Sequence, residues 1–302
     1  MSSYSRRDFL KTSLAAGAMA STVAAAAPTA LHAATSVTTR TALDKVTLGR
    51  SNVKATRLAF GSGTNNGYVQ ASLGQKEFNR LVAHAYERGV RFYETAESYM
   101  TPAMLGEALK PYPRESYVVM HKVTTNDGDP ARRFDAMLKT FQTDYFDIML
   151  LHWQTTSDWP TKSKKWQDGI EEFQSQKKII ARGASCHGLP AFSQVPGNKW
   201  LQVSLVRINH NGSRMDGDTF MDNNNPDHRD EVVAHIQQIK KENMGVIGMK
   251  LIGGGQFENS RADRQAAMRF AVQTAGVDCV TVGCKTTQEI DETIDNLNLA
   301  LA

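Results

Sequence analysis

The feature that most constrains this chain is a regular alternation of short apolar runs with segments of helical periodicity. Eight runs have the length and composition of buried β-strands: residues 57–61, 90–94, 117–121, 145–151, 179–185, 201–208, 245–249 and 279–283. Helical segments are expected between and after them: residues 78–86, 104–110, 130–141, 169–176, a poorer stretch near Phe192, 231–243, 262–274 and 289–297. Eight such pairs predict an α/β fold of one domain, a closed (β/α)8 TIM barrel.

Local signals support this order of elements. Asp129 followed by Pro130 predicts a helix start, and Gly89 predicts a helix end. Residues 46–50 have the character of a short hairpin before the first barrel strand. An open doubly wound sheet is the alternative, but it needs a glycine-rich phosphate turn leading into a long helix. Residues 60–64 contain two glycines without the rest of that pattern, so the barrel is favoured.

Composition excludes several classes of protein. The 302 residues are 41% hydrophobic, which is enough for a sizeable core. The formal net charge of +4 is small and no block of like charges occurs, so nothing indicates nucleic-acid binding. Three cysteines cannot form a disulfide framework. No run of 18 strongly apolar residues is present, so a stable membrane span is not expected.

The N-terminal residues have the layout of a signal peptide. A basic segment containing Arg6 and Arg7 precedes small, mildly apolar residues from 12 to 27. The segment resembles the twin-arginine export signal, including Phe9 and Leu10 after the arginines. An amphipathic docked helix is the alternative, which Pro28 disfavours.

From this layout we expect a cleaved signal at residues 1–34, a linker at 35–45 and the barrel at 46–302. The resemblance implies the twin-arginine export machinery as a partner. It also implies export of the folded protein to the periplasm.

Three ionisable residues follow or end neighbouring strands, where (β/α)8 barrels carry their chemistry. They are Glu94, Lys122 and His152, and Tyr99 lies in the loop after Glu94. Each has a plain structural alternative: a packing tyrosine, a solvated lysine, a satisfied histidine. Together they suit proton donation to an oxyanion as a hydride arrives at the carbon. Glu94 would hold the buried Lys122 ammonium, whose charge would favour an ionised Tyr99.

Several motifs resemble those of the aldo-keto reductases. Residues 92–99, Phe-Tyr-Glu-Thr-Ala-Glu-Ser-Tyr, resemble the F-D-T-A-x-x-Y segment of that family. Residues 140–153 resemble its L-x-T-D-Y-x-D-L-x-x-x-H-W segment. Residues 183–185, 246–250 and 282–286 stand where the family has its cofactor motifs. The resemblance spans residues 48–297 and implies a nicotinamide-dependent oxidoreductase that reduces an aldehyde or ketone, or oxidises the matching alcohol.

The resemblance also implies roles for single residues. Tyr99 would be the general acid, Lys122 would tune the pKa of Tyr99, His152 would orient the substrate, and Glu94 replaces the usual Asp. The implied cofactor residues are Ser185, Lys250, Gly283, Lys285, Thr286 and Glu292. The implied substrate-pocket residues are Trp153 and Arg207. NADP(H) is expected rather than NAD(H), although a carboxylate at Glu289 would repel a 2′-phosphate.

Two other functions stay open on the sequence. Glu94, Leu205 and Met249 depart from the family pattern and would suit a barrel that has lost turnover and acts as a periplasmic binding or accessory protein. A metal site could be built from residues that follow neighbouring strands, but their spacing is a poor motif and no metal is expected: His152, Cys186, His187 and His210. Acidic residues of the loop 209–227 miss the EF-hand spacing for calcium: Asp216, Asp218, Asp222 and Asp227.

Overall fold

The computed structural model describes residues 39–125, 128–219 and 226–302. The expected signal peptide at residues 1–34 lies outside these ranges, and so does Asp222 in the acidic loop. None of the helices within the described ranges is long and apolar enough to cross a lipid bilayer.

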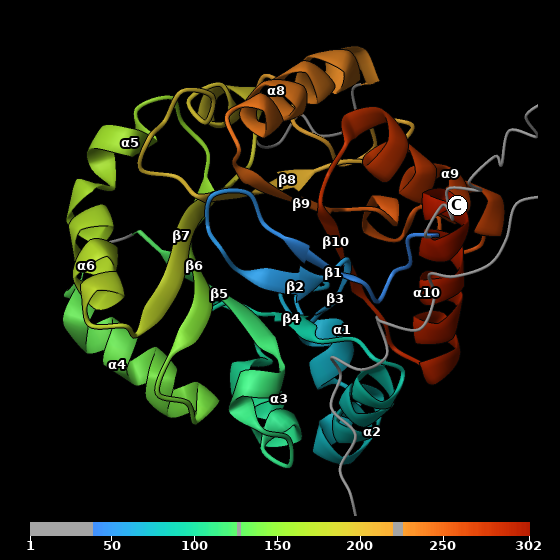
Figure 1. Cartoon of the computed structure of the whole chain (residues 1–302), viewed down its shortest axis with the longest axis horizontal. Helices are drawn as coiled ribbons and strands as arrows, with labels where there is room; N and C mark the ends of the chain where they lie inside the picture. The colour runs from blue at the N-terminus through green and yellow to red at the C-terminus, as the bar shows by residue number, and fades with distance from the viewer. Residues whose placement is uncertain (1–38, 126–127, 220–225) are drawn as a thin grey trace, which may run out of the picture. The chain divides into compact units, whose positions relative to one another are not determined.

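Eight parallel strands close into a barrel, with helices outside it (Figure 1). In the order in which they pair around the barrel, β10 is followed by β3 to β9. The strands are β3 (Leu58–Gly61), β4 (Phe92–Glu94), β5 (Val118–Thr124), β6 (Phe146–Gln154), β7 (Ile179–Cys186), β8 (Val203–Arg207), β9 (Gly245–Met249) and β10 (Cys279–Gly283). The predicted (β/α)8 barrel is confirmed, and the open sheet is excluded.

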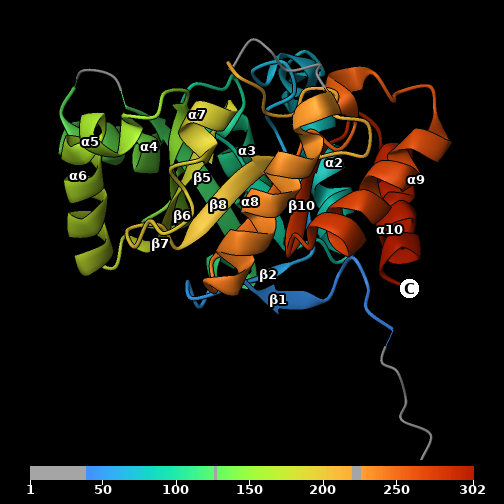
Figure 2. The same cartoon turned by 90° about the horizontal axis from the view of Figure 1, so that it is seen from above.

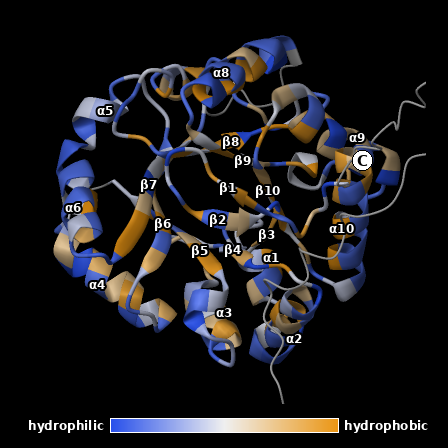
Figure 3. Cartoon of the chain, viewed as in Figure 1, coloured by the Kyte–Doolittle hydropathy of each residue, from blue (hydrophilic) through white to orange (hydrophobic). Residues whose placement is uncertain are grey.

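Helices lie at all the predicted places, and two further short ones, at residues 68–71 and 159–162, were not predicted. They are α1 (Tyr68–Ala71), α2 (Gly74–Glu87), α3 (Pro102–Leu109), α4 (Pro130–Phe141), α5 (Trp159–Lys162), α6 (Lys164–Ser175), α7 (Leu189–Phe192), α8 (Arg229–Lys241), α9 (Arg261–Arg269) and α10 (Thr287–Leu301). The Asp129 side chain accepts a hydrogen bond from Ala131 N at 3.1 Å, as expected of an N-cap. The stretch near Phe192 forms a single turn. Figure 3 shows hydrophobic residues gathered on the strands and alternating with hydrophilic ones along the helices.

The barrel interior is apolar toward the N-terminal ends of the strands. Alternate residues of the strands point inward and form one buried cluster, which includes Ala59, Phe92, Met120, Ile148, Leu150, Ala181, Val203, Leu205, Ile247 and Cys279. The antiparallel hairpin β1 (Lys45–Thr47) and β2 (Lys54–Thr56) lies under the barrel (Figure 2). Its residues Leu48, Val53 and Ala55 join the interior cluster. The hairpin therefore closes the barrel at the N-terminal ends of the strands.

Packing begins before the hairpin. Ala42 is fully buried, and its N–H donates to Asn298 Oδ1 at 2.8 Å. Residues at the end of the expected linker thus already contact the last helix, α10.

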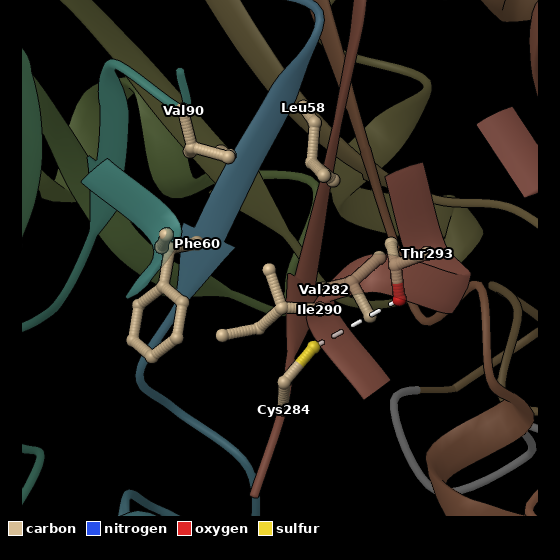
Figure 4. Close-up of a pocket in the computed structure, with 9 residues that line it drawn as sticks. Leu58, Phe60, Val90, Val282, Cys284, Ile290 and Thr293 are labelled. Atoms are coloured by element: carbon tan, nitrogen blue, oxygen red, sulfur yellow. Dashed lines mark hydrogen bonds between the residues drawn. The ribbon is translucent and has the colours of Figure 1, made fainter. Parts of the chain in front are cut away.

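A small gap lies between the barrel wall and the helices α2 and α10 (Figure 4). Its volume is about 10 Å³, and Phe60, Val282 and Ile290 are among the residues that line it. The Cys284 thiol lies 3.8 Å from the Thr293 hydroxyl at its edge. A gap of this volume holds at most one water molecule, so it is a packing defect and not a ligand site.

Candidate active site

The inward-facing positions become polar toward the C-terminal ends of the strands. Two residues beyond Phe92 stands Glu94, two beyond Met120 stands Lys122, and two beyond Leu205 stands Arg207. Because side chains of a strand alternate in direction, these residues point to the same interior as the apolar cluster. All three are at least nine-tenths buried. At the C-terminal ends of the strands the barrel interior therefore consists of buried charged side chains, and we call this layer the mouth.

Lys122 and Glu94 form an ion pair across two adjacent strands. The Lys122 ammonium contacts Glu94 Oε1 and also donates to the Thr95 carbonyl at 2.8 Å. The side chain of Lys122 is 1% exposed and that of Glu94 is 7% exposed. Lys122 does not end its strand as expected, because the pairing of β5 with β6 continues to Thr124. Its ammonium group consequently lies inside the barrel and needs the Glu94 carboxylate.

Glu94 is held in place by its backbone. The Glu94 carbonyl accepts from Ser62 N at 3.0 Å and from the Ser62 hydroxyl at 2.8 Å. The Thr101 hydroxyl in turn donates to the Ser62 carbonyl at 3.0 Å. These bonds tie the end of β4 to the loop after β3. They also fix the two ends of the loop that carries Tyr99.

Tyr99 lies beside the ion pair. Its ring packs on Gly63, where an added Cβ would stand 2.7 Å from the Tyr99 hydroxyl. The Lys122 ammonium lies 4.7 Å from the centroid of the Tyr99 ring. Burial and the neighbouring Glu94 carboxylate raise the pKa of Tyr99 well above its ordinary value. The shift is thus opposite in direction to the one expected, because burial and the Glu94 carboxylate both disfavour the phenolate, and the phenol keeps its proton.

His152 faces the same group of side chains. Its ring stands edge-on to Tyr99 with the centroids 5.6 Å apart, and the Ser98 hydroxyl lies 3.4 Å from its Nδ1. Burial, Lys122 and His121 lower the pKa of His152 to about 2. The imidazole is therefore neutral, and it can donate one hydrogen bond and accept another.

Trp153 is turned outward by an irregularity in β6. The register of β6 against β7 shifts between Leu151 and Gln154. Trp153 has φ 58°, a left-handed conformation that bulky residues rarely adopt. Bulges of this kind redirect side chains, and here Trp153 is 51% exposed at the end of the barrel strand. The expected substrate-pocket tryptophan therefore stands at the rim of the mouth and not in its floor.

A second polar group occupies the opposite wall of the mouth. The Ser185 hydroxyl lies 3.2 Å from His187 Nε2, and the other ring nitrogen of His187 contacts the Arg207 guanidinium. The Arg207 Nε atom is 3.5 Å from Asp216 Oδ1. Sequence reasoning had assigned His187 and Asp216 only to metal alternatives. Their role beside Arg207 has no local sequence signal, since it depends on how the loop after β8 folds back.

The metal alternatives find no support in the described ranges. No three His, Cys, Asp or Glu side chains there are grouped as metal ligands. Cys186 packs in the outer core, and burial raises the pKa of its thiol well above the ordinary value. Asp216 contacts Arg207, and Asp218 lies 3.5 Å from His228.

The expected cofactor residues at the ends of β9 and β10 are brought to one side of the mouth. Lys250 follows β9 directly and has φ 66°. Gly283 ends β10 under Thr64 and Gln70, where a Cβ would clash. Thr286 caps α10 by accepting from Glu289 N at 3.1 Å.

Acidic partners surround the two basic residues near that helix. The Lys285 ammonium contacts Glu258, and its backbone N–H donates to the Glu289 carboxylate at 2.7 Å. Glu292 pairs with Arg264 at 2.7 Å. Glu258 and Arg264 were not predicted as partners, because Glu258 lies in the loop after β9 and Arg264 lies in α9, and only folding brings them to these side chains.

Comparison with known proteins places this geometry in context. The model of the aldo/keto reductase family matches residues 57–266, more than half of the chain. The model of the twin-arginine translocation pathway signal sequence matches residues 3–23. Morphine 6-dehydrogenase from Pseudomonas putida is 30% identical over 131 residues, which are 39% of this chain and 42% of that protein. The chain thus matches less than half the length of this curated relative.

Solved structures agree in fold. A Pseudomonas aeruginosa protein assigned to the aldo-keto reductases has a TM-score of 0.70 at 17% identity, with 87% of this chain and 98% of that chain covered. An aldo-keto reductase from Klebsiella pneumoniae, solved in complex with NADPH, has a TM-score of 0.64 at 15% identity, with 84% and 89% covered. At these identities the likeness shows the fold alone.

The buried ion pair predicts a non-additive effect on stability. Glu94→Gln strands the Lys122 ammonium, and we expect it to lower the free energy of unfolding by about 3 kcal/mol. The double variant Glu94→Gln with Lys122→Met removes the stranded charge and should lose less than Glu94→Gln alone. Denaturant unfolding of both measures this. Glu77→Gln, at an exposed pair with Arg80, is the matched control and should change little. Additive losses in the double variant would contradict the analysis.

Proposed function

The chain belongs to the aldo/keto reductase family and carries a twin-arginine export signal, and on that premise we propose that it is an exported NAD(P)(H)-dependent oxidoreductase. Its reaction is the reduction of an aldehyde or ketone, or the oxidation of the matching alcohol. The observation that carries this proposal is the partly buried Tyr99, whose ring lies beside the Lys122–Glu94 pair and contacts His152.

Tyr99 and His152 act on the carbonyl oxygen. The oxygen accepts hydrogen bonds from the Tyr99 hydroxyl and from an N–H of the neutral His152 imidazole. As the carbon is reduced, negative charge develops on this oxygen, and Tyr99 transfers its proton there. The raised pKa of Tyr99 keeps the proton in place until an alkoxide, a stronger base, forms. A bound nicotinamide supplies the hydride.

The Lys122–Glu94 pair positions Tyr99. Lys122 lies against the face of the tyrosine ring, and its charge stabilises the phenolate that remains after proton transfer. Glu94 keeps the ammonium charged despite its burial, which by itself lowers the pKa of Lys122. Glu94 is a positioning residue in this scheme.

The mouth suits a nicotinamide cofactor. The buried Ser185 hydroxyl lies beside His187 in the wall of the mouth. Met249 and Lys250 lie next to the mouth at the end of β9. The buried side chain of Gln70, in α1, lies beside Gly283 at the end of β10. Its Oε1 atom has no hydrogen-bond partner among the described residues. Such an acceptor suits a polar ligand group near Gly283. We assign nicotinamide recognition to Ser185 and Lys250, and the nucleotide end to Gly283, Lys285, Thr286 and Glu292.

We propose NADP(H) as the cofactor in preference to NAD(H). Lys285 is the cation for the 2′-phosphate, but it is paired with Glu258 in this structure. Binding of the phosphate then requires Lys285 to exchange a carboxylate for a phosphate. Glu258 and Glu289 therefore weaken the binding of NADP(H), and the size of this effect can be measured.

The export signal determines the compartment in which the reaction takes place. We propose cleavage within residues 1–34, a linker at 35–45 and a barrel at 46–302 that folds, and binds its cofactor, before the twin-arginine machinery carries it to the periplasm. A small carbonyl compound or alcohol is the substrate there. Leu205, buried in the apolar interior cluster, and the partly buried Met249 beside the mouth also suit a barrel that binds ligands without turnover, and the next experiment distinguishes the two functions.

Tyr99→Phe tests the reaction. We expect kcat/KM for aldehyde reduction to fall by about 10²- to 10⁴-fold, because the proton donor is lost. NADPH binding, measured by fluorescence titration, should be retained. Tyr112→Phe is the matched control, because Tyr112 stacks on Tyr86 and not in the mouth. Equal activity of Tyr99→Phe and the wild type would refute the assignment, and absence of both activity and nucleotide binding would favour the ligand-binding alternative.

The pH profile follows from the two pKa directions. With the pKa of His152 lowered to about 2 and that of Tyr99 raised above its ordinary value, neither group changes protonation near neutrality. The acid form of Tyr99 is lost only at high pH. We therefore expect neither Tyr99 nor His152 to produce a limb in kcat/KM for reduction between about pH 5 and about pH 9. Steady-state assays across this range test it, and a limb near neutrality that His152→Gln abolishes would contradict a neutral His152.

Glu258→Gln tests the cofactor preference. Removing the carboxylate frees the Lys285 ammonium, and we expect NADPH to bind severalfold more tightly while NADH binding is unchanged. Calorimetric titration of both nucleotides measures this. Glu107→Gln, an exposed glutamate paired with Lys110, is the control. An equal change for NADPH and NADH would show that Lys285 does not bind the 2′-phosphate.

A further inference from the structure

Arg207 is a buried cation that the scheme above does not use. It ends β8, two residues beyond the inward-facing Leu205, and is 5% exposed. In the sheet register it is paired with Met249 of β9. Because of this position its guanidinium group lies inside the mouth and not on the outer surface of the barrel.

The contacts of Arg207 leave its guanidinium group incompletely paired. One terminal nitrogen contacts the ring of His187. Asp216 Oδ1 is 3.5 Å from Arg207 Nε and already accepts from Gly188 N at 2.7 Å. Among the described residues, neither Arg207 Nε nor Asp216 Oδ2 has a hydrogen-bond partner. A guanidinium group offers five donors in a planar fork, so this one retains capacity for a ligand.

The surroundings of Arg207 are rich in positive charge. Burial lowers the pKa of Lys250, and the nearby charges of Arg207, Arg214 and Lys122 lower it further, while Glu94 raises it. The aliphatic part of Arg214 lies over Gly254, where an added Cβ would stand 3.3 Å from its Cγ. Glu94 pairs with Lys122, and Asp216 lies near Arg207. Several cations thus act on this part of the mouth, which would attract a ligand with a negative group.

Arg207 is connected to the candidate catalytic residues through a row of rings. The rings of Tyr99 and His152 have centroids 5.6 Å apart, and those of His152 and His187 are 6.3 Å apart. His187 then contacts Arg207. One small molecule can thus place its carbonyl at Tyr99 and a second group at Arg207.

We propose that Arg207 binds an oxyanion group of the substrate, a carboxylate or a phosphate, and so selects aldehydes and ketones that carry an acid group. This proposal rests on the proposed function of the same site. The anionic group takes no part in the reaction. The carbonyl carbon gains the hydride, its oxygen gains the Tyr99 proton, and the acid group stays bound to the guanidinium fork.

Matched substrate pairs test the selection. The pairs are 4-carboxybenzaldehyde with benzaldehyde, and glyceraldehyde 3-phosphate with glyceraldehyde. We expect the wild type to prefer the acid member of at least one pair, which also separates carboxylate from phosphate. Arg207→Met should lower the ratio of kcat/KM values, acid over neutral, by about 10- to 100-fold. Arg88→Met, at an exposed arginine paired with Asp291, is the control and should keep the ratio.

Two further variants distinguish the loss of the anion site from a loss of folding. Arg207→Lys keeps a cation beside Asp216 but loses the fork, and it should lower the ratio less than Arg207→Met does. Arg207→Met combined with Asp216→Asn removes both charges and should show the same loss of selectivity as Arg207→Met. Thermal unfolding checks that each variant is folded. A ratio that is unchanged in folded Arg207 variants would overturn the proposal.

A binding assay separates this proposal from the proposed reaction. Benzoate contains the acid group and no reducible carbonyl, and calorimetry follows its binding without turnover. We expect its affinity to fall at least about tenfold in Arg207→Met. If no aldehyde is reduced but benzoate binding still depends on Arg207, the anion site stands while the reductase assignment fails. If aldehydes are reduced and neither benzoate binding nor the acid preference depends on Arg207, the anion site is refuted and the reductase assignment stands.

Discussion

The site depends on one buried ion pair, between Lys122 and Glu94. Neither charge could stay in the interior of the barrel alone, because removing an ammonium or a carboxylate from water costs several kcal/mol. Together they form the boundary between the apolar lower barrel and the polar mouth. One member of the pair also affects Tyr99: burial and the Glu94 carboxylate raise the pKa of the phenol, which therefore holds its proton.

The part of the mouth around His152 is shaped by the irregular strand β6. In a regular β6, His152 and Trp153 would simply point to opposite faces of the sheet. The register shift before Gln154 and the left-handed φ of Trp153 instead bring the indole to the rim, while His152 remains beside Tyr99. Left-handed conformations of bulky residues cost free energy and are concentrated at functional sites. The bulge therefore belongs with the ion pair as part of the construction of the mouth.

The sequence predicts local order well and long-range pairing poorly. The apolar runs predict the barrel strands, and Asp129 with Pro130 predicts the start of α4, because these signals act within a few residues. Strand β5 extends beyond the predicted end at His121, because its pairing continues to Thr124 although the charged Lys122 interrupts the apolar run. The partners of Lys285 and Arg207 could not be predicted, because Glu258 and Asp216 reach them through loops without local periodicity.

The distribution of charge around the mouth explains why its two sides differ in what they can bind. At the end of β10, Lys285 and Arg264 each face a carboxylate in solvent-accessible positions, so an anion arriving there competes with Glu258 or Glu292. At the end of β8, Arg207 is buried and its acidic neighbour Asp216 is poorly aligned, so an anion there meets a donor that is not fully used. Electrostatic attraction is also stronger in the buried setting, because solvent screens it less. On the proposed assignments, an acid group of the substrate would therefore meet less competition at Arg207 than a phosphate would meet at Lys285.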